Sequence, residues 1–446
     1  MFCFGGYHYG YNALKENFMS VGVFSYLRNG TDSSKQEMMF NYAFNTWINT
    51  QMVLISGAGL IMDKVGLRVL KLLAVSLYCI GTVMFAFTNE IASALLFPAG
   101  ILVALGSVSS LICDHQISSM FPAAQGLAIA LISGAFDSSA MITFIITKIS
   151  PDISLGSSFV FLAVASLVYG LLMGCFVLTR WAPDMAKQSR IEEIIHGMEL
   201  GPEKQIHNAS AIEQVEVDKI LQNIVRKRYP TLQSCILSLP FAALSLSFTI
   251  ALLRLTYFFT QLVPILNRAF PDQPETVTSL LKISSILLTA GLVVSPFSGF
   301  VLVYSKLYFK RRIEQAISQT SSTTGEIDLY WMYIRSMAPG FLVLAVSGIL
   351  CSALQFSTSQ IAFYTSCIVL AVYRSVLFSV CTNFILIAFP LRNFGTVNGL
   401  LYTLGGILNL LENIMQHVDT VSGVSISLAN SCMLLITPIF LFLKRN

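Results

Sequence analysis

The sequence GLIMDKVGLR, residues 59–68, joins two long apolar stretches and combines spaced glycines with charged residues. Glycines at such positions allow two helices to approach closely and the chain to turn tightly. Asp63 and Arg68 are placed to pair with charges or with helix ends on a neighbouring segment. We therefore predict that this signature loop latches one conformation of the protein, with the gating role carried by five residues: Gly59, Asp63, Lys64, Gly66 and Arg68.

The composition of the whole chain is that of a protein embedded in a lipid bilayer. Of the 446 residues, 55% are hydrophobic and 11% are charged, and the mean hydropathy is +0.71. Soluble proteins carry roughly 25% charged residues, so a soluble enzyme and a disordered scaffold are both excluded. The net charge of +4 forms no basic face, which excludes nucleic acid as a partner. The predicted fold class is an all-α polytopic membrane protein.

About twelve transmembrane helices are predicted, because a helix needs about 20 apolar residues to cross the hydrocarbon core. The first lies within residues 1–24, where Lys15 and Glu16 leave only part of a span, so this helix is predicted to be truncated. The others lie near 38–62, 69–88, 91–113, 124–148, 156–179, 236–263, 278–304, 337–357, 361–388, 394–415 and 422–443. The predicted domains are a six-helix bundle at 1–179, a polar cytoplasmic linker at 180–231 and a second six-helix bundle at 232–446.

Two features recur at matching places in the two halves. Gly299 and Lys306 repeat part of the signature loop, with Val303 at the position that Asp63 holds in the first copy. Each half also carries a Phe-Pro dipeptide followed closely by a glycine, namely Phe121-Pro122 with Gly126 and Phe389-Pro390 with Gly395. Duplicated six-helix halves around a central site are typical of secondary transporters. The predicted architecture is therefore two pseudo-symmetric bundles with an asymmetric latch.

The distribution of basic residues predicts the orientation in the membrane. Most of the 27 Lys and Arg residues fall in the signature loop, the linker and other loops on the same side. Because basic loops stay on the cytoplasmic side, both termini are predicted to be cytoplasmic. Asn29-Gly30-Thr31 is a glycosylation sequon in the first outer loop, so Asn29 is predicted to carry a glycan, and the protein is expected in the plasma membrane.

Two charged residues lie in the middle of apolar stretches, Asp137 in the fifth predicted span and Arg374 in the tenth. A charge at the bilayer centre costs a few kcal/mol or more, so such residues face a cavity or a partner. Two interpretations stay open. The pair can form a polar wall that binds a solute, through an aspartate acceptor and a forked arginine donor. It can also be a buried ion pair that holds the two bundles in register.

Other polar residues admit structural interpretations. Asp114, His115 and Glu412 lie near span ends, where we interpret them as reaching the membrane interface. His8 stands among Tyr7, Tyr9 and Tyr11, which form either an aromatic cavity that binds a flat ring or an interfacial belt. The nine cysteines lie in apolar stretches without a CxxC pair and are interpreted as small apolar side chains. Neither a zinc-binding spacing nor a phosphate-binding glycine loop occurs, so no metal, cofactor or catalytic residue is predicted.

The signature loop and its degenerate copy closely resemble the loop of the major facilitator superfamily. Several segments further resemble one branch of it, solute carrier family 43. These segments are Ser133–Ala140 (SGAFDSSA), Ile153-Ser154-Leu155, Ser158–Phe161, Arg374–Phe378, Asn383-Phe384, Ala388–Pro390, Asn393–Gly395 and, in the seventh span, Arg254 with Phe258 and Leu266-Asn267. The first helix departs from that family, because Tyr9-Gly10-Tyr11-Asn12 stands where a Phe-Gly-Trp-Pro stretch is usual.

This resemblance implies a facilitative, sodium-independent carrier. One branch of the family moves large neutral amino acids and the other moves purine nucleobases, and the aspartate of the fifth span is more similar to the nucleobase branch. The candidate substrate-binding residues are Asp137, Arg374, Ser138, Arg254, Tyr11 and Asn383.

We therefore expect a monomeric, non-enzymatic membrane transporter that moves a small-molecule solute down its gradient by alternating access of two bundles. Two alternatives stay open. A proton-coupled carrier of the same fold is possible because Asp137 can titrate when it is desolvated. A receptor-like membrane protein without transport is the other, because the first helix is short.

Overall fold

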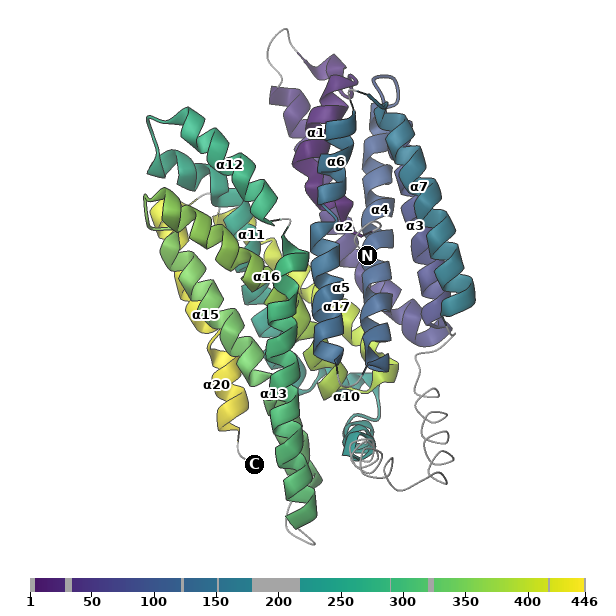
Figure 1. The fold of residues 1–446 in the computed structure, drawn as a ribbon, viewed down its shortest axis with the longest axis vertical. Helices are drawn as coiled ribbons and strands as arrows, with labels where there is room; N and C mark the ends of the chain where they lie inside the picture. Colours follow the sequence, from purple (N-terminus) through teal and green to yellow (C-terminus); the bar gives the residue numbers. More distant parts are fainter. Residues whose placement is uncertain are drawn as a thin grey trace, which may run out of the picture.

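The computed structural model describes residues 5–28, 34–121, 124–150, 152–178, 217–288, 290–319, 325–415 and 418–444. Within these ranges the regular secondary structure is helical, without a strand, which confirms the predicted all-α class (Figure 1). The predicted glycosylation site at Asn29 and most of the predicted linker lie outside the described residues.

The N-terminal half begins with a short 3-10 turn and continues through helices that run mostly along one axis. The turn is η1 (Tyr7–Gly10), and the helices are α1 (Tyr11–Ser20), α2 (Ser34–Val65), α3 (Leu67–Ala86), α4 (Leu96–Ile117), α5 (Gln125–Ser138), α6 (Met141–Ile149) and α7 (Leu155–Leu172). The signature loop forms the junction of α2 and α3, where Gly66 adopts φ 120° and ψ 157°. This backbone conformation favours glycine, so the sharp turn requires the residue that the sequence provides.

The C-terminal half follows a helix at residues 217–228. It contains α10 (Leu232–Ile236), α11 (Leu239–Ala269), α12 (Pro274–Leu288), α13 (Gly291–Gln319), α14 (Glu326–Arg335), α15 (Ala338–Leu354), α16 (Gln360–Ala388), α17 (Phe394–Asn409), α18 (Glu412–Met415), α19 (Thr420–Met433) and α20 (Ile436–Leu443). We call the end of the molecule that carries the signature loop the loop end. The helix at 217–228 and the C-terminal end of α20 lie at this end (Figure 1).

Nine helical segments of the described ranges are long and apolar enough to cross a membrane. Four of the twelve predicted spans do not coincide with one such helix, and the first of them, within residues 1–24, contains η1 and the ten-residue helix α1 in its described part. The span near 38–62 lies in α2, whose 32 residues include several charged and amide side chains. The span near 278–304 is divided between α12 and α13, and the span near 394–415 is divided between α17 and α18. Hydropathy averages over such breaks, so the sequence window did not detect them.

A further break divides the predicted fifth span into α5 and α6. The amide N–H of Ser139 bonds to the carbonyl of Phe136 at 3.2 Å, which tightens the last turn of α5. The Ser139 hydroxyl donates to the same carbonyl at 2.5 Å and so competes with the regular helical pattern. This break adjoins the start of α13, because Ser138 Oγ accepts a hydrogen bond from the Leu292 N–H at 2.8 Å.

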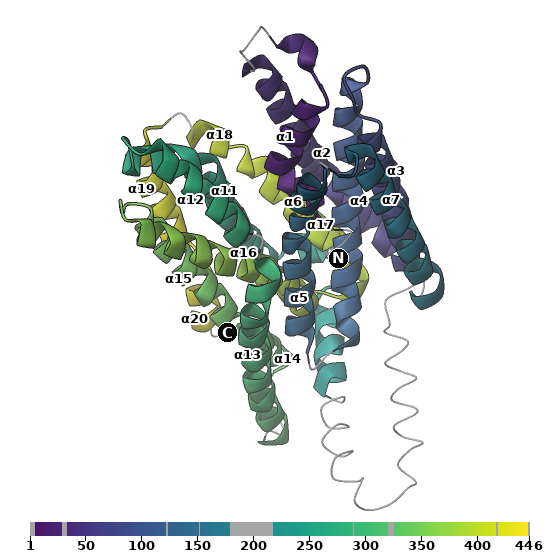
Figure 2. The same ribbon diagram turned by 45° about the horizontal axis from the view of Figure 1, so that its top comes forward.

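Helices of the two halves group into two bundles that meet along α2 with α17 and along α5 with α13 (Figures 1 and 2). Small residues set both contacts. A Cβ on Gly59 would lie 2.0 Å from the Gly395 carbonyl oxygen, and a Cβ on Gly134 would lie 2.5 Å from Ser295 Cβ. Backbones can approach this closely only where a side chain is absent. The bundles are therefore packed tightly together on the loop-end side.

The helix at residues 217–228 braces the loop end. Its apolar residues Val217, Leu221 and Val225 are buried. Asp218 forms an ion pair with Lys310 of α13 at 3.1 Å, and the Tyr229 hydroxyl lies 2.8 Å from the Tyr330 hydroxyl of α14. This described part of the predicted linker thus packs against helices of the C-terminal half.

Candidate functional site

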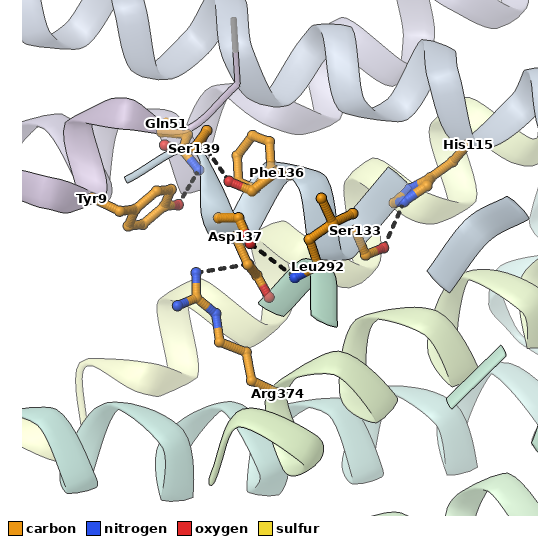
Figure 3. Close-up of polar contacts among 10 residues, drawn as sticks. Tyr9, Gln51, His115, Ser133, Phe136, Asp137, Ser139, Leu292 and Arg374 are labelled. Atoms are coloured by element: carbon orange, nitrogen blue, oxygen red, sulfur yellow. Dashed lines mark hydrogen bonds and ion pairs between the residues drawn. The ribbon is translucent and has the colours of Figure 1, made fainter. Parts of the chain in front are cut away.

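Asp137 and Arg374 form an ion pair between the two bundles. Arg374 Nη2 lies 2.7 Å from Asp137 Oδ1, and the side chains are 15% and 4% exposed, respectively. Asp137 is the penultimate residue of α5, and Arg374 lies in the middle of α16 (Figure 3). The structure thus places the two charged residues that the sequence singled out in direct contact, at the point where α5 breaks.

The first turn of α13 closes over this pair. A Cβ on Gly291 would lie 2.8 Å from Asp137 Cβ, so the glycine provides the space that the aspartate occupies. The next residue, Leu292, donates its backbone N–H to Ser138 Oγ. Free N–H groups at the start of a helix carry partial positive charge and favour a nearby carboxylate. Asp137 is therefore held by a guanidinium from one helix and lies beside the N-terminus of another.

Aromatic and amide side chains of the N-terminal half adjoin the pair. The Tyr9 ring packs edge to face against Phe136, with the ring centroids 5.9 Å apart. Gln51 of α2 donates to the Tyr9 hydroxyl at 3.1 Å (Figure 3), and its amide oxygen lies 3.3 Å from His8 Nε2. His8 is fully buried, and its Nδ1 has no hydrogen-bond partner among the described residues. The residues around His8 thus form an interior aromatic cluster rather than an interfacial belt, and the binding of a flat ring by this cluster stays a prediction.

Other amides line the C-terminal side at positions closer to the loop end. Asn383 of α16 and Asn398 of α17 are fully buried, and neither amide has a hydrogen-bond partner within the described chain. Asn383 approaches α5, because a Cβ on Gly126 would lie 3.3 Å from its Nδ2. Buried amides normally have partners, so water or a bound solute is needed to satisfy them.

The interpretation that His115 and Glu412 reach the membrane interface is wrong. His115 is fully buried, and its Nε2 lies 2.9 Å from Ser133 Oγ of α5. Glu412 is buried and accepts a hydrogen bond from Thr260. The physical reason is that neighbouring helices supply partners, which stabilise these two groups without exposure to water. Asp114, which is 19% exposed, forms an ion pair with Lys71 of α3 at 2.6 Å, and its interfacial position stays a prediction.

The signature loop contacts the other bundle through Asp63. Its two carboxylate oxygens accept hydrogen bonds from the backbone N–H groups of Gly395 at 2.9 Å and Thr396 at 2.6 Å. These N–H groups belong to the first turn of α17, where a carboxylate is favoured. Arg68 instead donates to the Cys175 carbonyl at 2.8 Å, and Lys64 is exposed. Asp63 is thus the residue of this loop that bonds across the two bundles.

Two predicted binding residues, Tyr11 and Arg254, bond to partners away from the Asp137–Arg374 pair. The Tyr11 hydroxyl donates to Asn41 of α2 at 3.1 Å, and its ring stacks on Phe44 within the N-terminal bundle. Arg254 donates to Ser352 and Gln355 of α15, within the C-terminal bundle. The structure therefore does not bring Tyr11 or Arg254 to the Asp137–Arg374 pair, and their solute-binding role stays a prediction.

Sequence reasoning missed two residues around the pair, Gln51 and Gly291, and the buried Asn398 closer to the loop end. A neutral amide in an apolar stretch is a weaker signal than a charge, because it costs less to bury. Asn398 lies in a largely apolar segment, which is the signal that could have identified it, whereas Gln51 follows other polar residues (Asn49 and Thr50) and does not stand out. Gly291 gave no signal, because its importance depends on the aspartate that packs against it.

Comparison with known proteins identifies the family. The model of the Major Facilitator Superfamily matches residues 13–411. The chain is 23% identical over 365 residues to equilibrative nucleobase transporter 1 of Bos taurus, which covers 79% of this chain and 72% of that protein. It is 22% identical to Protein FMP42 of Saccharomyces cerevisiae, with 92% and 85% covered.

Solved structures support the fold. The proton:xylose symporter XylE is similar with a TM-score of 0.59 at 14% identity, covering 99% of this chain and 93% of that chain. The E. coli fucose:proton symporter FucP has a TM-score of 0.52 at 11% identity, with 99% and 97% covered. These likenesses agree with a fold of two helical bundles. The chain belongs to the Major Facilitator Superfamily, and it is accordingly an integral membrane transporter of small solutes rather than an enzyme.

Proposed function

We propose that this protein is a facilitative, sodium-independent uniporter of purine nucleobases that works by alternating access. The observation that carries the proposal is the Asp137–Arg374 ion pair, which joins the two bundles. It lies where α5 ends and where α13 begins. The similarity to an equilibrative nucleobase transporter supports the choice of solute and the absence of coupling.

The surroundings of the pair suit a flat heterocycle with donors and acceptors on its edge. Asp137 offers acceptors for ring N–H groups, and Arg374 offers N–H donors for ring nitrogens or a carbonyl. Tyr9 and Phe136 offer aromatic faces at the same depth. The unpartnered amides of Asn383 and Asn398 add donors and acceptors closer to the loop end, along the path on which a solute would leave.

Movement follows from what the pair connects. When the bundles rock apart at the loop end, contacts between α5 and α16 have to loosen, and a solute that bonds to Asp137 and Arg374 can replace the lost interaction. Asp63 on the first turn of α17 stabilises the conformation that is closed at the loop end. The solute thus lowers the cost of separating two groups that would otherwise be left unpaired.

The proposed orientation places the loop end and both termini in the cytoplasm, because the basic residues concentrate there. In this orientation Asn29 faces the exterior, where it can be glycosylated, and the protein resides in the plasma membrane as a monomer. Cysteine labelling from each side of intact cells tests this arrangement.

The deciding experiment measures uptake of labelled adenine and labelled leucine in one cell line that expresses the full chain, with each compound also used as a competitor of the other. We expect saturable adenine uptake that is insensitive to sodium and little affected by leucine. Leucine uptake that adenine fails to inhibit would assign the amino acid branch instead. If the purified, reconstituted protein moves neither compound, its solute belongs to neither class and the proposed substrate is wrong.

Proton coupling is the second candidate, because Asp137 is a carboxylate that is 4% exposed inside the molecule. Recording intracellular adenine against the external concentration separates the two mechanisms. A uniporter stops at equal concentrations on both sides. Accumulation above the external level that collapses when the proton gradient is removed would establish a symporter.

A further inference from the structure

Arg254 is a second arginine inside the membrane-embedded region, and its surroundings differ from those of Arg374. It lies in the middle of α11 and is 1% exposed. Its Nε donates to Ser352 Oγ at 2.6 Å, and its Nη2 donates to Gln355 Oε1 at 3.1 Å, both on α15. The Phe258 ring lies 5.8 Å from the guanidinium carbon. Every one of these neighbours is neutral.

No carboxylate of the described residues forms an ion pair with this guanidinium. The nearest acidic side chains along the same end of the bundle are engaged in other contacts. Glu412 accepts from Thr260 Oγ1 at 2.5 Å, and Asp419 accepts from the Val421 and Ser422 N–H groups at the start of α19. An arginine stays charged at physiological pH, so Arg254 retains a buried positive charge that neutral oxygens compensate only in part.

Two hydrogen-bonding groups around this cage have no partner within the described part of the chain. Arg254 Nη1 is buried there without a hydrogen-bond acceptor, and the hydroxyl of Ser427 on α19 is buried without a partner. Ser427 belongs to the same cage, because its carbonyl accepts a bond of 3.5 Å from Ser352, the residue that binds Arg254 Nε. Ser431 adds another hydroxyl, 3.0 Å from Ser352 Oγ. Positive charge and unused donors together define a site suited to an anion.

A pocket leads from this cage toward the end of the bundle opposite the loop end. It is a narrow pocket that lies between α11, the end of α15 and the start of α16. Two of its lining residues, Phe258 and Gln355, are the ones that contact the Arg254 guanidinium. Ser359 and Ser366 add polar groups to an otherwise apolar wall. An anion that enters this pocket reaches the side chains that surround Arg254.

We propose that Arg254 and the serines of this cage bind a monovalent inorganic anion of the size of chloride. A small anion beside the guanidinium accepts a bond from Nη1 and neutralises the positive charge. Arg254 is the one cation among the described residues of this cage, which favours a single negative charge. The site lies within the C-terminal bundle, apart from the Asp137–Arg374 pair. Its occupant therefore stabilises the bundle and is independent of the transported solute.

The test compares the thermal unfolding midpoint of the purified full chain in sodium chloride and in sodium gluconate at equal ionic strength, because gluconate is too large for the cage. We expect a saturable rise of roughly 2–4 °C with chloride at a concentration several times its Kd. Bromide is expected to replace chloride and to give an anomalous diffraction peak beside Arg254 Nη1.

Arg254→Gln is expected to remove the difference between chloride and gluconate. The matched control is Arg268→Gln on the same helix, where the side chain is exposed, and it is expected to keep the full difference. Chloride sensitivity that survives in Arg254→Gln would overturn the proposal. If this variant does not fold, the measurements on the wild-type protein test the proposal. Equal unfolding midpoints in both salts, together with no bromide peak, would overturn it and would mean that water satisfies Nη1.

Discussion

Among the ion pairs of the described residues, two that are similar in length connect different kinds of helix pair. Lys71 and Asp114 are 2.6 Å apart and connect α3 with α4 inside the N-terminal bundle. Arg374 and Asp137 are 2.7 Å apart and connect α16 with α5, which belong to different bundles. The chemistry of the contact is therefore almost the same, and only the helices that carry it differ.

In the rocking motion proposed above, this difference gives each pair a different mechanical role. A pair inside one bundle moves with that bundle as a unit and is kept throughout a rocking motion. A pair between bundles is strained or broken whenever the bundles separate, which leaves charges that need a new partner. We infer that a buried charge in a transporter is linked to transport when its partner lies across the moving interface, and to stability when it does not.

The largest effect on uptake is expected for Asp137→Ala. The change removes an acceptor for solute and leaves Arg374 buried without its partner, which costs about 3–5 kcal/mol. Uptake is expected to fall by at least about 100-fold at normal surface expression, as measured with labelled adenine in intact cells.

The double variant Asp137→Ala with Arg374→Ala sharpens this result. A purely structural pair can be removed as a unit, so uptake would return in the double variant. A solute-binding pair leaves transport lost in both variants, and normal uptake by Asp137→Ala alone would assign the aspartate a structural role.

A smaller loss is expected for Gly291→Ala, which adds a methyl group 2.8 Å from Asp137 Cβ. The contact forces α13 away from α5 and displaces the carboxylate, so uptake is expected to fall about tenfold, in line with an overpacking cost of 1–3 kcal/mol. Gly57→Ala is the matched control, because its Cβ would meet no atom within 4 Å. Equal uptake by the two variants would show that this contact is unimportant.

Asp63→Ala is expected to reduce uptake to an intermediate extent, through a lower turnover number. Loss of a carboxylate from a helix N-terminus costs about 0.5–2 kcal/mol, so the conformation closed at the loop end is populated less. We expect a turnover number about three- to tenfold lower with KM nearly unchanged, measured from concentration series of initial uptake. Lys64→Ala, which alters an exposed neighbour, is expected to behave like the wild type. A rise in KM without loss of turnover would argue against a latch.

The smallest effect on uptake is expected for Asp114→Asn, in the pair that stays within one bundle. The variant is expected to lower the thermal unfolding midpoint, because Lys71 is left with Ser110 as its polar partner. Uptake per correctly folded molecule at the surface is expected to stay within about twofold of the wild type. Loss of uptake as large as that of Asp137→Ala would remove the distinction between the two pairs.

The sequence identified candidate functional residues, but it did not show which of them contact each other. Asp137, Arg374 and Arg254 gave the same signal, since each is a charge in an apolar stretch. Only the structure separates them, by placing the first two together and Arg254 in a neutral cage on α15. His115 was assigned to an interface because it lies near a span end, yet a serine of α5 provides its partner. A local sequence pattern does not show which residue of another helix will be the partner.

What the sequence by itself determined is the class of protein, namely a helical membrane protein with the signature loop of the Major Facilitator Superfamily. Hydropathy, positive charge and glycine spacing act over a few helical turns, so they can be read along one chain. The tertiary structure alone decided where helices break, that Asp63 reaches α17, and that Asp137 meets Arg374 beside Gly291. These contacts depend on how two bundles pack against each other, and that packing is set by shape complementarity across the whole interface.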